Sequence, residues 1–417
     1  MRIALVLAQP PGYSETFFNS KIKGLQDHGM DVRLYCQSKK NGFTLCPVIR
    51  SPRVSRNPLL QSWYLLKELL FLLPHWPAVI RYIKLERKEG TGFLQLFKKI
   101  YLNAHLLKAD LDWLHFGFAT MALGSETVAK AIGAKMAVSF RGFDINVYPI
   151  KHPECYNLLW KYVDKVHSIS HYLLEKARSK GLPRATPYAI ITPAVQLATL
   201  PTHLAPKASS GPVKIVTIAR LHWIKGLDIA IAAMRILKER GLNFRYHIIG
   251  DGNQNETERY KFMAYELGLQ REVVFTGKRS HQATLEQLAA SDIYLQPSLN
   301  EGFCNAVLEA QALGKLSIAS NVGGLPENIV DGKTGWLFET QNPEALAATI
   351  QKIIALSPEE KTKITKTAQK RVREEFNINK QQSEFIGFYE KKVPLGGIQG
   401  DRIGSAVQPK ETTKEEP

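Results

Sequence analysis

Residues 298–314 read SLNEGFCNAVLEAQALG, and the rest of the chain is organised around them. A short apolar run at residues 293–295 predicts a buried strand just before this stretch, and a helical pattern occupies its second half. The loop between strand and helix brings the backbone N–H groups of Phe303, Cys304 and Asn305 to a helix N-terminus. Such groups lack intrahelical acceptors, so they suit a phosphate or a sugar hydroxyl.

Two carboxylates flank this helix N-terminus. Glu301 lies in the loop and Glu309 follows inside the helix, so both side chains can face one pocket from different depths. An ionised carboxylate only accepts hydrogen bonds, and its two oxygens suit the paired hydroxyls of a sugar ring or a ribose. An amphipathic helix with one solvated glutamate has the same spacing, so the interpretation depends on the neighbouring sequence.

The pattern Glu301-x7-Glu309, with Gly302-Phe303 after the first Glu and Ala310 after the second, resembles the signature of glycosyltransferase family 4. Members of this family are retaining nucleotide-sugar transferases. The resemblance implies an α/β fold of the GT-B type, with two Rossmann-like domains facing each other across a cleft. The segment SFRGFDINVYP at residues 139–149 is similar to the bacterial exopolysaccharide enzymes of the colanic-acid type.

A second motif strengthens the resemblance. The apolar run 213–219 predicts a strand, and Arg220, Lys225 and Gly226 follow it in an Arg-x4-Lys-Gly pattern that is similar to the diphosphate site of the same family. Two fixed cations can stabilise the negative charge on a departing nucleoside diphosphate without a metal ion. Two solvated basic residues on a loop would look the same, but the order of this motif before the glutamate pair favours the diphosphate site.

The resemblance implies a role for each candidate residue. Arg220 and Lys225 would hold the diphosphate, Glu309 the ribose diol, and Glu301 the donor sugar; Arg220, Lys225 and Glu301 are the expected catalytic residues. The expected donor-binding set is Gly12, Arg220, Lys225, Glu301, Phe303, Cys304, Asn305 and Glu309. The resemblance also implies no metal, no cofactor, and a front-face attack in which the leaving phosphate oxygen helps to deprotonate the acceptor.

Composition indicates a globular chain with an acidic partner. The 417 residues suit two domains, with 44% hydrophobic and 22% charged residues. The four cysteines have no metal-ligand spacing, which indicates a reducing cytosol. The N-terminal apolar run is too short for a secretion signal, and no segment is suited to span a membrane. The net charge of +17 requires an acidic partner, which could be a phosphorylated substrate, a membrane surface or nucleic acid.

Alternation of strand and helix patterns predicts the domain boundaries. The expected parts, in chain order, are a Rossmann-like acceptor domain (1–195) with a basic helical insertion (50–110), a hinge (196–212), a nucleotide-sugar-binding domain (213–375), a helix returning to the first domain (376–392), and a disordered tail (393–417).

Three residues of the first domain are candidates for the cleft between the domains. In the family, the strand predicted at residues 135–140 usually ends in a His-Gly or His-Asp pair, whereas Arg141 stands here and replaces a possible general base with a fixed cation. We expect His115 and Asp144 at the cleft. A strand-end capping role fits each of them equally well.

Asp110 and Asp112 form a DxD pattern, with which a different class of transferases holds a divalent metal. The pattern directly precedes the predicted strand at residues 113–116, where Asp is a common turn residue. We therefore expect no metal site here.

The insertion indicates where the protein acts. Its 11 Lys and Arg residues face 4 Asp and Glu residues, and aromatic side chains are interspersed among them, which suits the headgroup layer of an anionic membrane. A helical face that only packs on the sheet fits the same pattern. We expect a lipid-linked saccharide acceptor and a peripheral, salt-sensitive association with the inner face of the cytoplasmic membrane. The expected contact residues are Lys84, Arg87, Lys88, Lys98 and Lys99.

No nucleic-acid module is recognisable, so we expect no nucleic acid partner.

Two other functions stay open. The chain could be a GT-B nucleotide-sugar 2-epimerase or hydrolase, or a non-catalytic nucleotide-sugar binding protein. The presence of both motifs argues against the non-catalytic alternative, and the basic, aromatic first half argues for a separate acceptor and hence against the epimerase.

Overall fold

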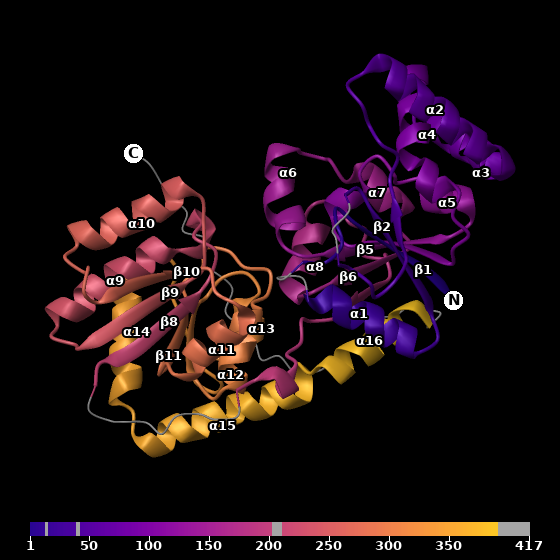
Figure 1. Cartoon of the computed structure of the whole chain (residues 1–417). Helices are drawn as coiled ribbons and strands as arrows, with labels where there is room; N and C mark the ends of the chain where they lie inside the picture. Colours follow the sequence, from indigo (N-terminus) through magenta and orange to yellow (C-terminus); the bar gives the residue numbers. More distant parts are fainter. Residues whose placement is uncertain (13–15, 39–41, 202–210, 391–417) are drawn as a thin grey trace, which may run out of the picture.

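The computed structural model describes residues 1–12, 16–38, 42–201 and 211–390 of the 417-residue chain. These residues form two parallel sheets that stand next to each other, each with helices packed against it (Figure 1). The prediction of an α/β fold with two Rossmann-like domains is therefore confirmed.

The first sheet has 7 strands in the order β3-β2-β1-β4-β5-β6-β7, and all its pairings are parallel. Its strands are β1 (Arg2–Leu7), β2 (Asp31–Cys36), β3 (Val48–Arg50), β4 (Trp113–Phe116), β5 (Lys135–Phe140), β6 (Lys165–Ser168) and β7 (Tyr188–Ile190). Strands β4 and β6 are buried at every position, because helices cover both faces of a parallel sheet.

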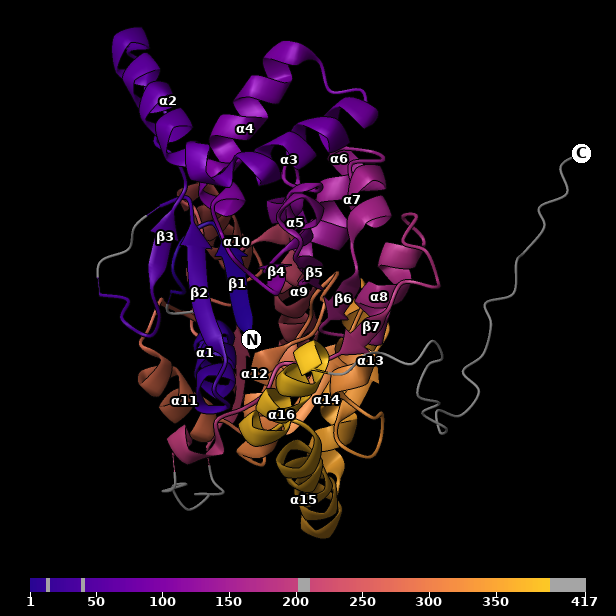
Figure 2. The same cartoon turned by 90° about the vertical axis from the view of Figure 1, so that its right-hand side faces the viewer.

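The helices of the first domain connect these parallel strands. They are α1 (Thr16–Asp27), α2 (Pro58–Leu72), α3 (Trp76–Lys88), α4 (Phe93–Leu107), α5 (Val128–Ile132), α6 (Tyr148–Lys151), α7 (Asn157–Tyr162) and α8 (His171–Arg178). Short turns are η1 (Leu73–His75), η2 (Ala119–Ala122), η3 (Phe143–Val147) and η4 (Leu197–Thr199). Helices α2, α3 and α4 lie above the first sheet in Figure 2, and buried residues of α3 and α4 belong to the same core as β4, β5 and β6.

The second sheet has 6 strands in the order β10-β9-β8-β11-β12-β13, again with parallel pairings throughout. Its strands are β8 (Val213–Ile218), β9 (Phe244–Ile249), β10 (Val273–Gly277), β11 (Ile293–Gln296), β12 (Leu316–Ser320) and β13 (Trp336–Phe338). Its helical elements are η5 (Trp223–Lys225), α9 (Leu227–Glu239), α10 (Gln254–Glu266), α11 (His281–Ala289), α12 (Asn305–Ala312), α13 (Leu325–Asn328) and α14 (Pro343–Ala355). Strand order changes direction between β8 and β11, and ligands bind at such a switch point in open α/β sheets.

Two C-terminal helices cross from the second domain to the first. Helix α15 (Pro358–Glu375) runs along the second domain, and α16 (Ile378–Glu390) packs on α1 (Figure 1). The Gln382 side-chain amide donates to the Ser20 carbonyl at 3.1 Å, and Phe385 and Phe388 are buried in the core that α1 shares with β1 and β2. Residues 202–210, within the predicted hinge, and the predicted disordered tail lie outside the described residues.

The two domains also share part of one apolar core. Phe303 and Leu308 of the second domain belong to the same buried cluster as residues of β4, β5 and β6, together with Phe376 at the end of α15. The rings of Phe303 and Phe376 are 5.7 Å apart. Packed side chains therefore hold the domains together in addition to the chain connections. Among the described residues, no helix combines the length and the apolar character of a membrane span.

His115 lies inside the first domain, so its prediction as a cleft residue is wrong. It is fully buried in β4, with Nδ1 2.5 Å from the Tyr389 hydroxyl of α16 and Nε2 2.8 Å from the Ser139 hydroxyl of β5. Burial, assisted by the charge of Lys21, lowers the pKa of His115 well below its ordinary value. Helix α16, which returns from the second domain, covers this part of the sheet. The sequence pattern of the first-domain strands does not predict that this helix packs there.

Candidate active site

The two predicted donor-site motifs meet at one ion pair. Lys225 ends the turn η5 after β8, and Glu301 lies in the loop after β11; the Lys225 Nζ atom is 2.5 Å from Glu301 Oε2. Burial alone would lower the pKa of Lys225, but the charge and hydrogen bond of Glu301, together with neighbouring Cys304, outweigh burial and raise this pKa. Lys225 is therefore a cation at neutral pH, although both side chains are largely buried.

Arg220 and Gly226 complete the first motif. Arg220 is exposed in the loop after β8, and its charge acts on the Lys225 amine in the direction opposite to that of Glu301. Gly226 has φ +60°, and a Cβ atom there would lie 2.0 Å from the Pro297 carbonyl oxygen. Only glycine allows the β8 loop to come this close to the β11 loop, and this contact places Lys225 beside Glu301.

The Glu301 loop is held in place by the segment after β12. The Gly324 N–H donates to the Glu301 carbonyl at 2.8 Å, and a Cβ atom on Gly323 would lie 2.2 Å from the same oxygen. The two glycines therefore let one loop pack directly on the backbone of the other, which fixes the direction of the Glu301 side chain.

Glu309 is paired with a histidine that the sequence analysis did not identify. His281 begins α11, and its Nε2 is 2.9 Å from Glu309 Oε1. The hydrogen bond to Glu309 raises the pKa of His281. The available sequence signal was its position just after the end of β10, at the sheet edge where ligands bind. Glu309, which the sequence analysis predicts to bind a ribose diol, is therefore hydrogen-bonded to another side chain in this structure.

The helix N-terminus differs from the prediction at one amide. The Cys304 N–H donates to the Asn328 side-chain oxygen at 2.9 Å, so the prediction that this N–H is free for a ligand is wrong. Asn305 is the first residue of α12, and its N–H is one of the four that have no acceptor within a helix. Phe303 is buried between the domains rather than lining an open site. Burial raises the pKa of the Cys304 thiol to about 12, so it is not a thiolate nucleophile at neutral pH.

Asn300 links the Glu301 loop to the first domain. It accepts a hydrogen bond from the Asn146 amide at 2.7 Å and donates one to the Tyr172 hydroxyl at 2.9 Å. Nearby, the Glu327 carboxylate accepts from the backbone N–H groups of His171 at 2.9 Å and Tyr172 at 2.8 Å, at the start of α8. The sequence analysis missed these residues because their partners are more than a hundred positions away.

Arg141 and Asp144 organise the facing loop of the first domain. The Arg141 guanidinium lies 3.8 Å from the ring centroid of Phe17 in α1. Asp144 is fully buried, and its carboxylate accepts from the N–H groups of Arg141 at 3.0 Å, Gly142 at 2.9 Å and Ala119 at 3.1 Å. Of the two interpretations of Asp144, the structure supports backbone capping.

The remaining candidate residues lie away from the Lys225–Glu301 ion pair. Asp110 pairs with the Arg2 side chain, and Asp112 accepts from the Arg2 N–H at 2.7 Å, so both carboxylates serve the start of β1. In the part of the chain that the structure describes, no group of three or more His, Cys, Asp or Glu side chains is arranged to hold a metal. Gly12 lies after β1 beside residues 13–15, which are outside the described residues, and its role toward the donor stays a prediction.

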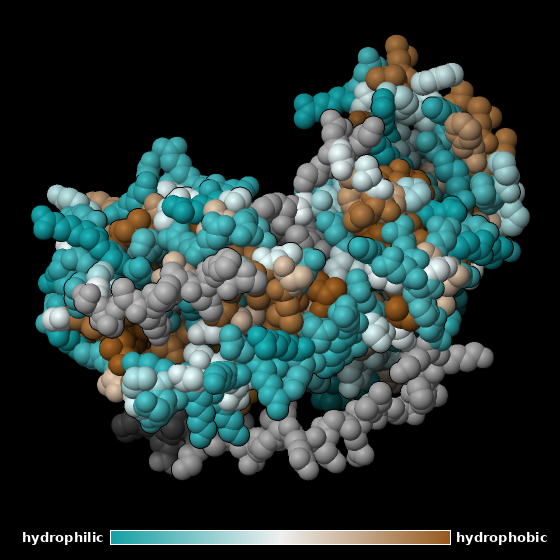
Figure 3. All heavy atoms as spheres, turned by 60° about the horizontal axis from the view of Figure 1, so that its bottom comes forward, coloured by the Kyte–Doolittle hydropathy of each residue, from teal (hydrophilic) through white to brown (hydrophobic). Residues whose placement is uncertain are grey.

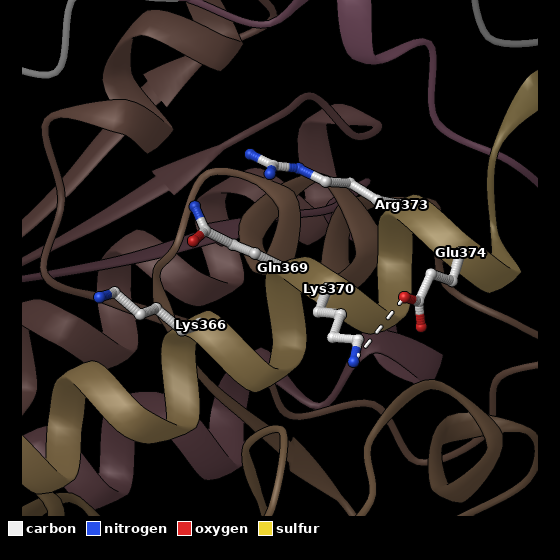
Figure 4. A pocket seen from close by; sticks show the side chains of 5 residues that line it. All are labelled: Lys366, Gln369, Lys370, Arg373 and Glu374. Atoms are coloured by element: carbon white, nitrogen blue, oxygen red, sulfur yellow. Dashed lines mark ion pairs between the residues drawn. The ribbon is translucent and has the colours of Figure 1, made fainter.

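A polar hollow on α15 contains none of the donor-site residues. Its lining side chains all come from that helix: Lys366, Gln369, Lys370, Arg373 and Glu374 (Figure 4). Lys370 and Glu374 form a long ion pair of 3.9 Å, and Gln369 donates to the Ala312 carbonyl at the end of α12. We interpret this hollow as a feature of helix packing rather than a ligand site.

Two Rossmann-like domains joined by returning C-terminal helices, with a cation–carboxylate cluster at the switch point of the second sheet, define the class of GT-B glycosyltransferases. Residues 203–371 match the family described as "Glycosyl transferases group 1". The chain belongs to this family, which confirms the resemblance seen in the sequence.

Its relatives include enzymes named for exopolysaccharide synthesis. The "Putative colanic acid biosynthesis glycosyltransferase WcaL" of Escherichia coli K12 is 30% identical over 282 residues, which cover 65% of this chain and 68% of that protein. The "Amylovoran biosynthesis glycosyltransferase AmsK" of Erwinia amylovora is 27% identical over 401 residues, covering 90% and 96%.

Solved structures share the fold at lower identity. A glycosyltransferase of Rickettsia africae superimposes with a TM-score of 0.67 at 22% identity, covering 93% of this chain and 97% of that one. Anabaena Alr3699/HepE, solved in complex with UDP-glucose, superimposes with a TM-score of 0.68 at 17% identity, covering 93% and 98%. Both confirm the GT-B architecture.

Proposed function

We propose that the protein is a retaining, metal-independent glycosyltransferase of the hexosyltransferase type. It moves a sugar from a nucleoside diphosphate sugar to a saccharide acceptor carried on a lipid, in the synthesis of a bacterial surface polysaccharide. It acts in the cytoplasm, as a peripheral protein at the inner face of the cytoplasmic membrane. The observation that carries the proposal is the convergence of Lys225 and Glu301, with Arg220 nearby, at the switch point of the second sheet.

This arrangement suits the departure of a nucleoside diphosphate. The negative charge on the leaving oxygen grows as the glycosidic bond breaks, and a preorganised cation stabilises that charge most in the transition state. Lys225 supplies such a cation in a largely buried position. Arg220 supplies a second cation, which is exposed to solvent. When the diphosphate engages Lys225, the Glu301 oxygens become available to accept hydroxyls of the donor sugar.

A front-face mechanism fits the groups at this site. Cys304 is held as a thiol, and Asp144 is capped by three backbone N–H groups, so neither is suited to attack the anomeric carbon. The leaving phosphate oxygen would then accept the proton of the acceptor hydroxyl as the acceptor attacks from the same face. Glu309 would hold the ribose diol once His281 releases it.

The names of the relatives support a role in polysaccharide synthesis and a nucleotide-sugar donor. The Escherichia coli and Erwinia proteins are named for colanic acid and amylovoran biosynthesis, and the Anabaena protein was solved with UDP-glucose. An acceptor carried on a lipid diphosphate would lie at the membrane surface. The charge of +17 suits an anionic surface of that kind.

Purified protein incubated with a panel of labelled nucleoside diphosphate sugars, with and without membrane extract, tests the proposal. Transfer of label to an extractable lipid only when extract is present is the expected result. Release or isomerisation of the sugar at the same rate without extract would instead identify a hydrolase or 2-epimerase. Binding of the donor without any turnover would identify a non-catalytic binding protein.

A further inference from the structure

Helix α2 exposes most of its apolar side chains. Among its 15 residues, PLLQSWYLLKELLFL, only Leu72 is buried. Leu59 is 84% exposed, Trp63 61% and Leu70 58%, with Leu66 and Phe71 also exposed. A surface helix of a globular protein normally buries its apolar stripe against the core, and α2 does not.

The neighbouring helix α4 also exposes apolar side chains. Phe93, Leu94 and Phe97 of α4 are exposed, and the rings of Phe93 and Phe97 are 4.9 Å apart. We call the exposed residues Leu59, Trp63, Leu66, Leu70, Phe71, Phe93, Leu94 and Phe97 the apolar ridge. Apolar side chains gather in this part of the molecule at the upper right of Figure 3, where α2 and α4 extend beyond the first sheet in Figure 2. Exposed apolar patches with polar residues at their rim mark sites of interaction with a partner or a membrane.

The helices that carry the ridge also carry many basic residues, most of which are exposed. The acidic residues of helices α2 and α3 are paired: Glu86 is fully buried and pairs with Lys99 at 2.7 Å, and Glu68 is half-buried and pairs with Lys108 at 2.7 Å. The exposed basic residues of α2, α3, α4 and the segment before them are Arg53, Arg56, Lys67, Arg81, Lys84, Arg87, Lys88 and Lys98. The exposed charge around the ridge is therefore positive.

We infer that the apolar ridge inserts into the acyl-chain boundary of an anionic phospholipid leaflet while the surrounding Lys and Arg side chains contact the headgroups. This inference rests on the proposed function, since it names the surface by which the enzyme reaches a lipid-linked acceptor. An apolar face bordered by basic residues, with tryptophan at the boundary, is complementary to such a leaflet. A second copy of the chain would bring an equally positive rim against this one, which disfavours self-association.

The ridge changes the expected mode of attachment. If charge alone caused membrane binding, high salt would abolish the binding. Insertion of apolar side chains adds a hydrophobic contribution to the binding free energy, which salt does not screen. The ion pair with buried Glu86 also removes Lys99 from the predicted headgroup contacts, because its replacement would leave a buried carboxylate unpaired.

The test compares two double variants of exposed residues. Trp63→Gln with Leu70→Gln changes the ridge, and Phe262→Gln with Tyr265→Gln changes two side chains of α10 that are 64% and 62% exposed in the second domain. Sedimentation with phosphatidylcholine vesicles containing phosphatidylglycerol measures binding at low and high salt. We expect the ridge variant to bind at least about tenfold more weakly at both salt concentrations, with the α10 variant within about twofold of the unchanged protein.

A second measurement detects insertion directly in the unchanged protein. Vesicles whose lipids carry bromine in the acyl chains should quench tryptophan fluorescence, and the quenching should be smaller in the ridge variant. Equal effects of both double variants, or no quenching in the unchanged protein, would overturn the inference. Self-association that the ridge variant abolishes, without vesicle binding by the unchanged protein, would assign the ridge to a second copy and also overturn it.

Binding of nucleoside diphosphate sugars by the same proteins separates this inference from the proposed function. We expect the ridge variant to keep its donor affinity, because α2 contributes no donor-site residue. Vesicle binding through the ridge without any donor binding would refute the proposed function and leave the inference standing.

Discussion

Lys225 and Glu301, which are 76 positions apart in the chain, form an ion pair of 2.5 Å in the second domain. The pair connects the Arg-x4-Lys-Gly motif to the loop that carries the first glutamate of the Glu-x7-Glu pattern. In the proposed function a donor diphosphate and Glu301 compete for the same ammonium group, so the proposal predicts that donor binding releases the Glu301 carboxylate.

Replacement of Lys225 by Ala should reduce turnover much more than donor binding. The charge on the leaving diphosphate is largest in the transition state, and loss of one preorganised donor typically lowers kcat by about 10²–10³-fold. Initial rates of nucleoside diphosphate release measure the effect. Lys238→Ala, which removes a lysine paired with Glu272 elsewhere in the domain, is the control and should keep the rate. A Lys225→Ala enzyme with more than about a tenth of the original kcat would contradict the assigned role.

Replacement of Glu309 by Ala should weaken donor binding. Ribose hydroxyls left unpaired in a closed site cost about 1–3 kcal/mol, which corresponds to about 5–150-fold in Kd. Calorimetric titration with the nucleoside diphosphate measures the change. Glu286→Ala on the exposed side of α11 provides the comparison and should bind normally. Unchanged affinity in Glu309→Ala would exclude the ribose role.

Donor affinity should rise with pH around the pKa of His281. The hydrogen bond to Glu309 raises this pKa above the ordinary value of about 6.5, so protonated His281 occupies the carboxylate at lower pH and releases it as the pH rises through the raised pKa. Because the folded state raises the pKa of His281, the pairing also stabilises the folded protein. This stabilisation is fully present below pH of about 6.5 and is lost as the pH rises through the raised pKa. His281 is 48% exposed, so the stability effect is small.

A nucleoside diphosphate sugar is the appropriate ligand for this measurement, because its diphosphate has no ionisation near neutral pH. Kd should be measured between about pH 5.5 and 8.5, the window that brackets the ordinary histidine pKa. His281→Gln should flatten the profile while retaining donor binding. An unaltered pH dependence in that variant would show that another group titrates.

Removal of divalent metal ions should leave activity within about twofold, because the proposed function assigns to Arg220 and Lys225 the positive charge that a metal provides in other transferases. Turnover in the presence of EDTA, compared with added magnesium or manganese, measures this. Strict dependence on either ion would contradict the proposed donor site.

Replacement of Gly226 by Ala should destabilise the protein and displace Lys225. The new Cβ would lie 2.0 Å from the Pro297 carbonyl oxygen, in addition to the strain of φ +60°. Gly241→Ala is a matched control, since Gly241 has φ +79° but no atom within 4 Å of the added Cβ. We expect a loss of about 1–2 kcal/mol in the control and about 2–4 kcal/mol at Gly226, measured by denaturant unfolding. Equal losses would mean that the close contact with Pro297 is unimportant.

Short-range patterns allowed much of the fold to be predicted. Near-continuous apolar runs such as residues 213–219 specify strands buried on both faces, and their alternation with helical patterns specifies parallel sheets. The same local reading identified Lys225, Glu301 and Glu309, because the strand–loop–helix crossings that carry them lie within short segments.

The partners of these residues could not be predicted in the same way. His281 pairs with Glu309, Asn328 occupies the Cys304 amide, and α16 buries His115, each through contacts between distant segments. Whether a polar group faces a ligand, water or another side chain depends on what packs over it.

The sequence by itself determined the class of fold, the family and the order of the two donor-site motifs. The class of fold follows from the periodicity of apolar residues, and the family and its two motifs follow from the resemblance of these segments to a known signature. Only the tertiary structure decided that Lys225 neutralises Glu301, that His115 is a core residue and that α2 leaves its apolar side chains exposed. Burial is a property of the assembled chain: the free energy of a charged or apolar side chain is set by the neighbours that exclude water from it, and those neighbours come from remote parts of the sequence.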